Sequence, residues 1–294
     1  MPPEDPSLTP GLYLVATPIG NLGDITLRAL DVLRNCDRIA CEDTRQTQKL
    51  LNHYGIDKPT ISCHEHNERQ RAAEFIAEIQ SGCAIAVVSD AGLPGISDPG
   101  QVLVAEAIRA GVPVIPIPGA NAALTALIAS GLSTDSFTFL GFLPERAGER
   151  RSRLENLAAQ PRKCAETLVF YEAPHRILET LSDIEAIFGA LSRAAVAREL
   201  TKLHEEFLRG SIAEIRADLA ARDRVRGEFV LLIEAPPSAQ AAAATHESLT
   251  ARIARLQSEE GLDEKDALKH LARELGQSKS DVYRELQRER ARRK

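Results

Sequence analysis

The sequence AIAVVSDAGLPGISDPG, residues 84–100, is the best guide to the architecture of this chain. Its first five residues are apolar and either small or β-branched, which predicts a buried strand. The strand then breaks into a loop with three glycines and two prolines. Glycine lets the main chain lie close to a ligand, and proline keeps a loop open without a flexible hinge. No lysine that could bind a phosphate follows the loop, so we expect a neutral or cationic ligand here and no nucleoside triphosphate.

Outward from this loop, short apolar runs alternate with amphipathic segments over residues 11–133. Five successive strand–helix units are typical of a parallel sheet with helices on both faces, which is an α/β fold. Several of the helices open on an Asp, Thr or Asn residue that can cap them. The predicted strands are 12–16, 38–41, 60–63, 84–89 and 112–117, and the predicted helices are 24–35, 45–54, 68–80, 101–110 and 120–129.

A second block over residues 134–235 has strands that follow one another more closely. This spacing predicts a separate domain, α/β or α+β, whose sheet is mixed. The predicted strands are 137–142, 167–171, 194–197, 206–208 and 229–233, and the predicted helices are 150–159, 174–187 and 211–221.

The C-terminal part begins with a linker, predicted for 236–245 from its proline- and alanine-rich composition. Residues 246–294 then contain three helical patterns. The second pattern stops at Gly276, and Ser280 is expected to cap the third. A helix, a glycine turn and a second, capped helix with basic residues at its C-terminal end are typical of a helix-turn-helix, so we predict such an appendage.

The composition is that of a soluble globular protein with an aliphatic core. Hydrophobic residues make up 44% and charged residues 27% of the 294 positions, which fits this class, and tryptophan is absent. No apolar run reaches about 18 residues, so we expect no membrane span. The N-terminus is acidic and proline-rich, unlike a secretion signal. Five cysteines without a CxxC pair indicate free thiols and a cytoplasmic protein.

The charge of the chain is unevenly distributed. The net charge of -6 argues against nonspecific coating of nucleic acid. Residues 246–294 nevertheless hold twelve Lys and Arg against ten Asp and Glu, so this part is positive while the rest is negative. A local basic face that binds nucleic acid therefore remains open.

Two further loops join a strand to a helix, at 17–24 and at 116–123. The first loop could bind a dinucleotide, because Glu42 and Asp43 follow at the distance where an acid would bind the ribose. However, the loop has only two glycines, and Pro18 lacks the N–H group that would face a phosphate. For the first loop we favour binding of a ligand other than a dinucleotide, and the alternative is a tight turn with no ligand. For the second loop we also favour ligand binding, and the alternative is that it only starts the following helix. Since the carboxyl ends of parallel strands meet at one edge, the three loops predict a shared crevice.

Polar clusters outside these loops have ordinary alternatives. His64 and His66 lie at metal-ligand spacing, but no second ligand group follows, so we expect no metal and favour a polar strand end or a substrate contact. Basic residues at predicted strand ends are suited to RNA phosphates, although surface ion pairs or helix caps would also explain them. These residues are Arg45, Arg176, Arg198 and Lys202.

Seven motifs in this order resemble the tetrapyrrole-methylase superfamily, and within it the branch that methylates small-subunit ribosomal RNA. The resemblance covers residues 11–234 and implies two αβα domains of the class III methyltransferase type, with a helix-turn-helix-like appendage in this branch. The motifs are TPIGNLGDIT (17–26), EDTR (42–45), VVSDAGLPGISDPG (87–100), PIPGANAA (116–123), FYEAPHR (170–176), RELTKLHEE (198–206) and GEFVLLIE (227–234).

The resemblance implies that S-adenosylmethionine binds in the cleft between the two αβα domains, and that the protein is a homodimer. The acceptor would be the ribose 2′-hydroxyl of a decoding-centre cytidine in the small (30S) ribosomal subunit. One departure is that Ser89-Asp90-Ala91 replaces the Gly-Asp-Pro of the tetrapyrrole enzymes, which keeps the acid but changes the loop. By resemblance, the cofactor contacts are Ile19, Asp90, Leu93, Asn121, Ala122 and Tyr171.

A ribose hydroxyl is a poor nucleophile, so a nearby base would assist the transfer. The sequence does not choose among five candidates, and a mechanism without a base stays open. The candidates are Glu172, His175, Glu199, Lys202 and Glu228. For RNA phosphates we select Arg45, Arg176 and Arg198, with the tail helix 281–290 as a further anchor.

Two other functions stay open. A tetrapyrrole C-methyltransferase would share the fold and cofactor, but the basic loops and the tail favour RNA. A non-catalytic nucleic-acid-binding regulator would explain the tail but not three ligand loops at one sheet edge.

Overall fold

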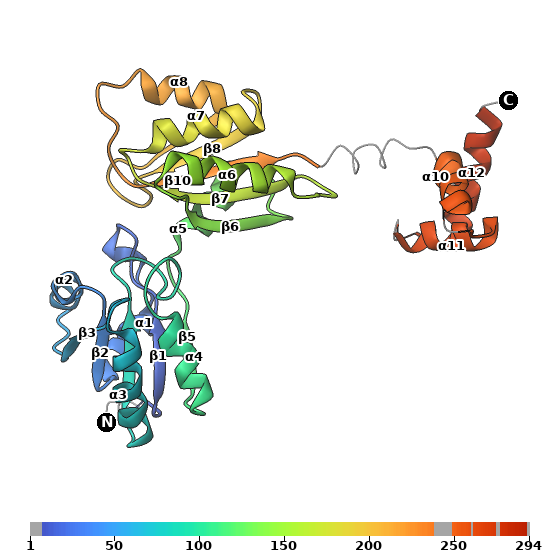
Figure 1. The fold of residues 1–294 in the computed structure, drawn as a ribbon. Coiled ribbons are helices and arrows are strands. Elements are labelled where there is room, and N and C mark those ends of the chain that lie inside the picture. The colour runs from blue at the N-terminus through green and yellow to red at the C-terminus, as the bar shows by residue number, and fades with distance from the viewer. Residues whose placement is uncertain (1–7, 238–248, 260, 275–276, 293–294) are drawn as a thin grey trace. The chain divides into compact units, whose positions relative to one another are not determined.

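The computed structural model describes residues 8–237, 249–259, 261–274 and 277–292. The chain forms two compact units, one that holds both sheets and one that holds the C-terminal helices (Figure 1). Residues 238–245 of the predicted linker and Gly276 lie outside the described residues. Among the helices that are described, none is long and apolar enough to span a bilayer.

The first sheet is parallel, as the sequence predicts, with the strand order β3-β2-β4-β1-β5. The helix expected over 24–35 is shorter, because the Thr26 side chain accepts a hydrogen bond from the Ala29 N–H and starts the helix there. The elements are β1 (Gly11–Val15), α1 (Leu27–Asn35), β2 (Arg38–Cys41), α2 (Thr44–His53), β3 (Thr60–Ser62), α3 (Glu68–Gln80), β4 (Ala84–Val88), α4 (Gln101–Arg109) and β5 (Val114–Ile117).

Helices cover both faces of this sheet because the side chains along each strand alternate between two cores. Tyr13 and Val15 pack with α1 and α2, whereas Leu12 packs with Phe75 of α3 and Leu103 of α4. These aliphatic cores fix the strands, so the loops at their carboxyl ends can carry function.

The second sheet is mixed, as expected, with the order β6-β7-β10-β8-β9. Strands β6 and β7 are parallel, and β8 is antiparallel to both of its neighbours. The elements are β6 (Phe137–Phe142), α6 (Ala147–Ala159), β7 (Glu166–Glu172), α7 (Ile177–Phe188), β8 (Arg193–Arg198), β9 (Glu206–Ser211), α8 (Ile212–Ala220) and β10 (Phe229–Ala235).

Helix α5 (Ala122–Ser130) follows the last strand of the first sheet but packs on the second. Its Ala126 and Leu127 contact a core that includes Val230, while α6, α7 and α8 cover the opposite face. Helix α5 therefore lies before the expected domain boundary at 133/134 in the sequence but packs with the strands that follow this boundary. The rest of the predicted domain division stays a prediction.

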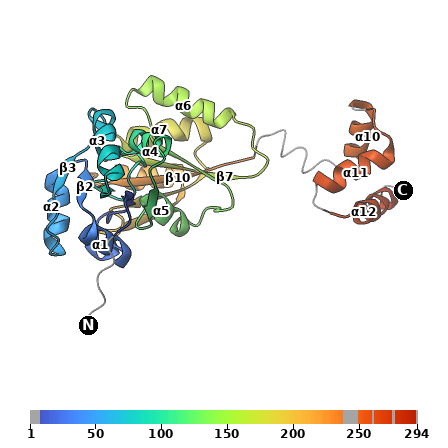
Figure 2. The ribbon, with the colours of Figure 1, turned by 90° about the horizontal axis from the view of Figure 1, so that it is seen from below.

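The C-terminal unit is a bundle of α10 (Leu249–Glu259), α11 (Glu264–Glu274) and α12 (Lys279–Arg292) (Figures 1 and 2). Leu271 and Leu286 belong to its small apolar core. The cap of α12 is Ser278, whose hydroxyl accepts the Asp281 N–H, and not Ser280 as expected. Helix α12 therefore starts earlier than its apolar pattern indicates.

Candidate active site

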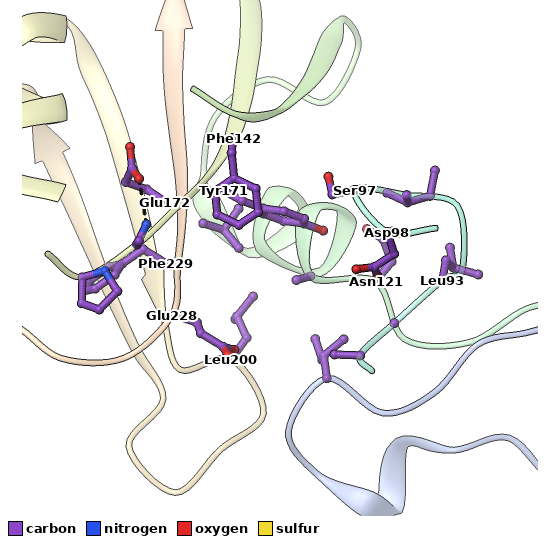
Figure 3. Close-up of a pocket in the computed structure, with 18 residues that line it drawn as sticks. Leu93, Ser97, Asp98, Asn121, Phe142, Tyr171, Glu172, Leu200, Glu228 and Phe229 are labelled. Atoms are coloured by element: carbon purple, nitrogen blue, oxygen red, sulfur yellow. Dashed lines mark hydrogen bonds between the residues drawn. The ribbon is translucent and has the colours of Figure 1, made fainter. Parts of the chain in front are cut away.

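A cavity of about 360 Å³ lies between loops of the first sheet and strand ends of the second (Figure 3). This volume is in the range of small-molecule sites, roughly 300–1,000 Å³. Its walls are mainly apolar and aromatic. The lining residues are Ile19, Ala91, Gly92, Leu93, Ile96, Ser97, Asp98, Asn121, Ala122, Phe142, Tyr171, Glu172, Ala173, Pro174, Leu200, Glu228, Phe229 and Val230.

The loops after β1 and β4 are joined by backbone hydrogen bonds. The Thr17 N–H donates to the Gly92 carbonyl at 2.9 Å, and the Gly92 N–H donates to the Thr17 carbonyl at 3.1 Å. Gly92 has φ +81°, a conformation that favours glycine. Strands β1 and β4 are neighbours at the point where the strand order reverses, which is where ligands bind in such sheets. The pairing holds Ile19 and Leu93 at the cavity.

The second half of the glycine-rich loop is closed by hydrogen bonds to a buried carboxylate. One oxygen of Glu68, on α3, accepts the N–H groups of Gly100 at 3.0 Å and Leu103 at 2.8 Å. Glu68 is 5% exposed, and it lies at the N-terminus of α4, where a negative charge is favourable. The loop between these anchors includes Ser97, in the left-handed region at φ +61°.

The third loop contributes Asn121 and Ala122. The Asn121 side chain accepts the Leu124 N–H at 2.9 Å and so starts α5 at the cavity wall. A Cβ at Gly119 would lie 2.7 Å from that of Ala16, so the approach of this loop to β1 requires glycine. All three loops therefore meet at one crevice, as the sequence predicts.

Aromatic rings from the second sheet form the facing wall. The ring centre of Tyr171 on β7 lies 4.9 Å from that of Phe139 and 5.7 Å from that of Phe142, and both contacts are edge-on. Burial, opposed by a hydrogen bond from the Ala123 backbone and helped by the nearby Asp98 charge, raises the pKa of Tyr171. The phenol therefore stays neutral and supplies an amphipathic surface.

Two acids of the glycine-rich loop occupy different positions. Asp98 lines the cavity and is partly buried. Burial, and after it the charges of Glu42 and Asp90, raise the pKa of Asp98 to about 6. Asp90 lies outside the lining and accepts the Asp43 N–H at 3.2 Å. Its expected cofactor contact stays a prediction.

Glu172 lines the cavity, but its oxygens are fully engaged. One oxygen accepts the Arg176 guanidinium at 2.6 and 2.9 Å and the Ala173 N–H at 2.8 Å, and the other accepts the Thr180 hydroxyl at 2.6 Å. Glu172 is 2% exposed and Arg176 is 9% exposed. This arrangement suits a structural ion pair better than a base. Arg176 is buried in this ion pair, so its guanidinium is not exposed for the RNA contact expected from the sequence.

The other catalytic candidates cluster at the cavity rim, apart from His175, which is exposed and outside the lining. The Lys202 ammonium contacts Glu199 at 3.0 Å and Glu228 at 2.9 Å. Of these three, only Glu228 lines the cavity, and its side chain is 80% exposed. The two carboxylates raise the pKa of Lys202 despite partial burial, so it stays charged.

The turn that carries Glu199 and Lys202 is strained and tied to the first loop. Glu199 and Thr201 have φ values of +52° and +64°, which cost energy in residues other than glycine. The Thr201 hydroxyl accepts the Asn21 N–H at 3.1 Å. Such strain is typical of functional sites.

The two remaining RNA candidates differ in accessibility. Arg45 has a side chain that is 88% exposed, paired with Asp43 at its own helix start. Arg198 donates to the Arg226 carbonyl at 2.6 Å and to Glu206 at 3.2 Å, so its guanidinium is largely occupied. Arg45 is the one that can readily turn toward a phosphate.

The His64 motif has local contacts. The His64 ring lies 3.3 Å from the Asn67 amide and packs edge-on against His66. Across the described parts of the chain, no group of three or more His, Cys, Asp or Glu side chains is arranged to hold a metal ion. The arrangement suits a polar strand end.

The comparisons with known proteins agree on one family. Residues 11–216 match the family model of the Tetrapyrrole (Corrin/Porphyrin) Methylases. The chain belongs to the tetrapyrrole methylase family. It is 47% identical over 277 residues to "Ribosomal RNA small subunit methyltransferase I" of Halalkalibacterium halodurans, which covers 92% of this chain and 93% of that protein. The Bacillus subtilis protein of the same name is 47% identical over 275 residues, with 92% of both chains covered.

Solved structures show the same tetrapyrrole methylase fold. Diphthine synthase is similar with a TM-score of 0.57 at 15% identity, over 76% of this chain and 89% of that one. Uroporphyrin-III C-methyl transferase from Thermus thermophilus, complexed with S-adenosyl homocysteine, has a TM-score of 0.53 at 17% identity, over 75% of this chain and 96% of that one. The predicted fold class is thus confirmed, and the chain is a methyltransferase.

The described residues of this tetrapyrrole methylase fit S-adenosylmethionine. The cavity combines apolar and aromatic surface for a nucleoside with the main chain of Gly92 and a carboxylate, Asp98, for a positively charged group. Five of the six expected cofactor residues line it. They are Ile19, Leu93, Asn121, Ala122 and Tyr171.

Sequence reasoning missed Asp98 and Glu68 as site residues. Asp98 stands in the quoted loop as the acid of a second Ser-Asp pair, and this repetition was an available signal. Glu68 carried none, because only the fold brings α3 to the loop that it closes.

Proposed function

We propose that this protein transfers the methyl group of S-adenosylmethionine to the ribose 2′-hydroxyl of a decoding-centre cytidine in small-subunit ribosomal RNA. The observation that carries the proposal is a small-molecule cavity at the switch point of a tetrapyrrole-methylase sheet, in a chain nearly half identical to relatives named as small-subunit RNA methyltransferases. A protein with this substrate works in the cytoplasm.

The bound cofactor supplies an activated methyl group on a positively charged sulfur. The protein's main contribution is then to orient the reactants, which provides roughly 7–11 kcal/mol in well-aligned reactions. The Thr17–Gly92 pairing and the Glu68 carboxylate hold two walls of the cavity in place. Phe142 and Tyr171 supply the aromatic surface on the other side.

Glu228 is the best-placed group to accept the proton of the ribose hydroxyl. It is the one carboxylate among the five candidates that lines the cavity and is exposed. Lys202 beside it supplies a positive charge that stabilises both the carboxylate and a developing alkoxide. Positioned bases of this kind contribute roughly 10²–10⁴-fold to a rate.

RNA contacts come from Arg45 and from a line of cations on α11. Lys265, Lys269 and Arg273 recur every four residues, are exposed and form no ion pair with another described residue. The carboxylates at the two ends of α11 are paired inside the bundle, Glu264 with Arg290 and Glu274 with Arg252. The remaining acid of α11, Asp266, is also exposed, so three exposed cations stand against this one carboxylate and the surface of the helix is positive on balance.

A homodimer would cover an exposed apolar strip on α5. Leu124 and Ile128 are 48% and 78% exposed and lie one turn apart, on the side of the helix away from its buried Ala126 and Leu127. Burial of aliphatic side chains of this kind favours self-association. Sedimentation of the wild type and of Ile128→Glu tests this, because the substitution should shift the population toward monomer.

A competition for acceptors tests the function. The protein is incubated with tritiated S-adenosylmethionine and, in parallel, purified 30S subunits, free ribosomal RNA and a tetrapyrrole precursor. We expect label on the RNA of 30S subunits and none on the tetrapyrrole. Label on the tetrapyrrole alone would make the protein a tetrapyrrole methyltransferase, and cofactor binding without any transfer would favour a regulator.

A further inference from the structure

The cavity holds one carboxylate whose charge is not balanced by the protein. Three carboxylates line it, and two have cationic partners: Glu172 is bound to Arg176 and Glu228 to Lys202. Asp98 is within 4 Å of no Lys, Arg or His nitrogen in the described chain. Its side chain faces the cavity from the glycine-rich loop (Figure 3).

The surroundings of Asp98 increase this negative charge. Glu42 at the end of β2 and Asp90 at the end of β4 both act on it electrostatically, and the neighbouring neutral groups are Ser89 and Tyr171 on β7. The nearby His64 acts on Glu42. A ligand at this wall therefore experiences an attractive field if it is positive.

We propose that Asp98 faces the sulfonium of S-adenosylmethionine and so makes the cavity selective for this cofactor over its product S-adenosylhomocysteine, which keeps the same amino group but has an uncharged thioether sulfur. This inference rests on the proposed function. In the transfer the methyl–sulfur bond breaks, the sulfur keeps the electron pair and loses its positive charge, and a methyl–oxygen bond forms as the hydroxyl proton leaves to the base. The attraction to Asp98 thus ends with the reaction, and product release is favoured.

The selectivity should depend on pH. Below pH about 6 Asp98 takes up a proton, and the preference for the charged cofactor declines. Burial and the charge of Asp90 also raise the pKa of Glu42. The charge of Glu42 is in turn one of the causes that raise the pKa of Asp98. Removing the Glu42 charge should lower the pKa of Asp98 and move the decline to lower pH.

Calorimetric titration of both ligands between pH 5 and 8 tests the proposal. In the wild type we expect the ratio of Kd for S-adenosylhomocysteine to Kd for S-adenosylmethionine to fall as the pH is lowered. Asp98→Asn should reduce the ratio about tenfold at pH 8, with little pH dependence left. Glu42→Gln should keep the ratio at pH 8 and shift its midpoint downward. The control Asp223→Asn, at an exposed position, should behave like the wild type.

Two results would overturn the inference: equal weakening of both ligands in Asp98→Asn, or a wild-type ratio that does not change with pH. Melting temperatures of the variants show whether each is folded. Methyl transfer to 30S subunits by the wild type, measured at pH 8, is independent of these ratios. A wild type that binds neither ligand would reject both the inference and the proposed function.

Discussion

At the scale of single residues, the structure separates acids that hold the fold from acids that face the cavity. Glu172 is buried and bound on both oxygens, whereas Glu228 is exposed at the rim. The sequence could not distinguish them, because both are Glu residues at strand ends and only burial and partners decide their roles.

Glu172→Ala should destabilise the protein. Removing one partner of a buried ion pair leaves Arg176 uncompensated and costs about 3–5 kcal/mol. Chemical denaturation measures the loss, and His175→Ala, at an exposed neighbour, should change stability little. A stable Glu172→Ala protein that has lost methyl transfer would instead identify Glu172 as the base.

Glu228→Gln should leave the melting temperature nearly unchanged, since the side chain is exposed, and should lower the rate of methyl transfer by roughly 10²-fold or more. Single-turnover transfer at saturating cofactor measures this. A wild-type rate would support a mechanism without a base.

At the scale of elements, the strands and their loops followed well from the sequence, because apolar β-branched runs and glycine punctuation are local signals. The parallel order and the meeting of three loops followed from the alternation of strands and helices. The packing of α5 on the second sheet did not, because it depends on which of two apolar surfaces the helix meets. The closure of the glycine-rich loop by Glu68 is likewise a product of tertiary structure.

Glu68→Ala should raise the Kd for S-adenosylmethionine by about tenfold, because two charge-assisted hydrogen bonds to the loop are lost. Glu68→Gln keeps an acceptor oxygen and should recover much of the affinity. Equal affinities in both variants and the wild type would show that this anchor does not shape the cavity.

At the scale of the whole molecule, catalysis and RNA binding are assigned to different parts of the chain. The cavity belongs to the unit with the two sheets, and the α11 cations belong to the C-terminal unit. The charge segregation in the sequence predicts RNA contacts for the tail helix 281–290, and this stays a prediction, although Arg290 is paired with Glu264.

Reversal of Lys265, Lys269 and Arg273 to Glu should weaken binding to 30S subunits and lower the slope of log K against log salt by about one per cation removed. S-adenosylmethionine affinity should not change. The charge-preserving variant Lys265→Arg/Lys269→Arg/Arg273→Lys should keep the wild-type slope. Identical slopes in all three proteins would remove α11 from the RNA interface.

The central claim is that this cavity directs a methyl group to a sugar oxygen of ribosomal RNA. Alkaline hydrolysis of labelled 30S RNA tests it most directly, because a 2′-O-methyl group blocks cleavage at its own nucleotide. We predict that the label appears in an alkali-resistant dinucleotide that begins with a methylated cytidine. Label released in a mononucleotide would mean that a base is methylated, and it would contradict the account.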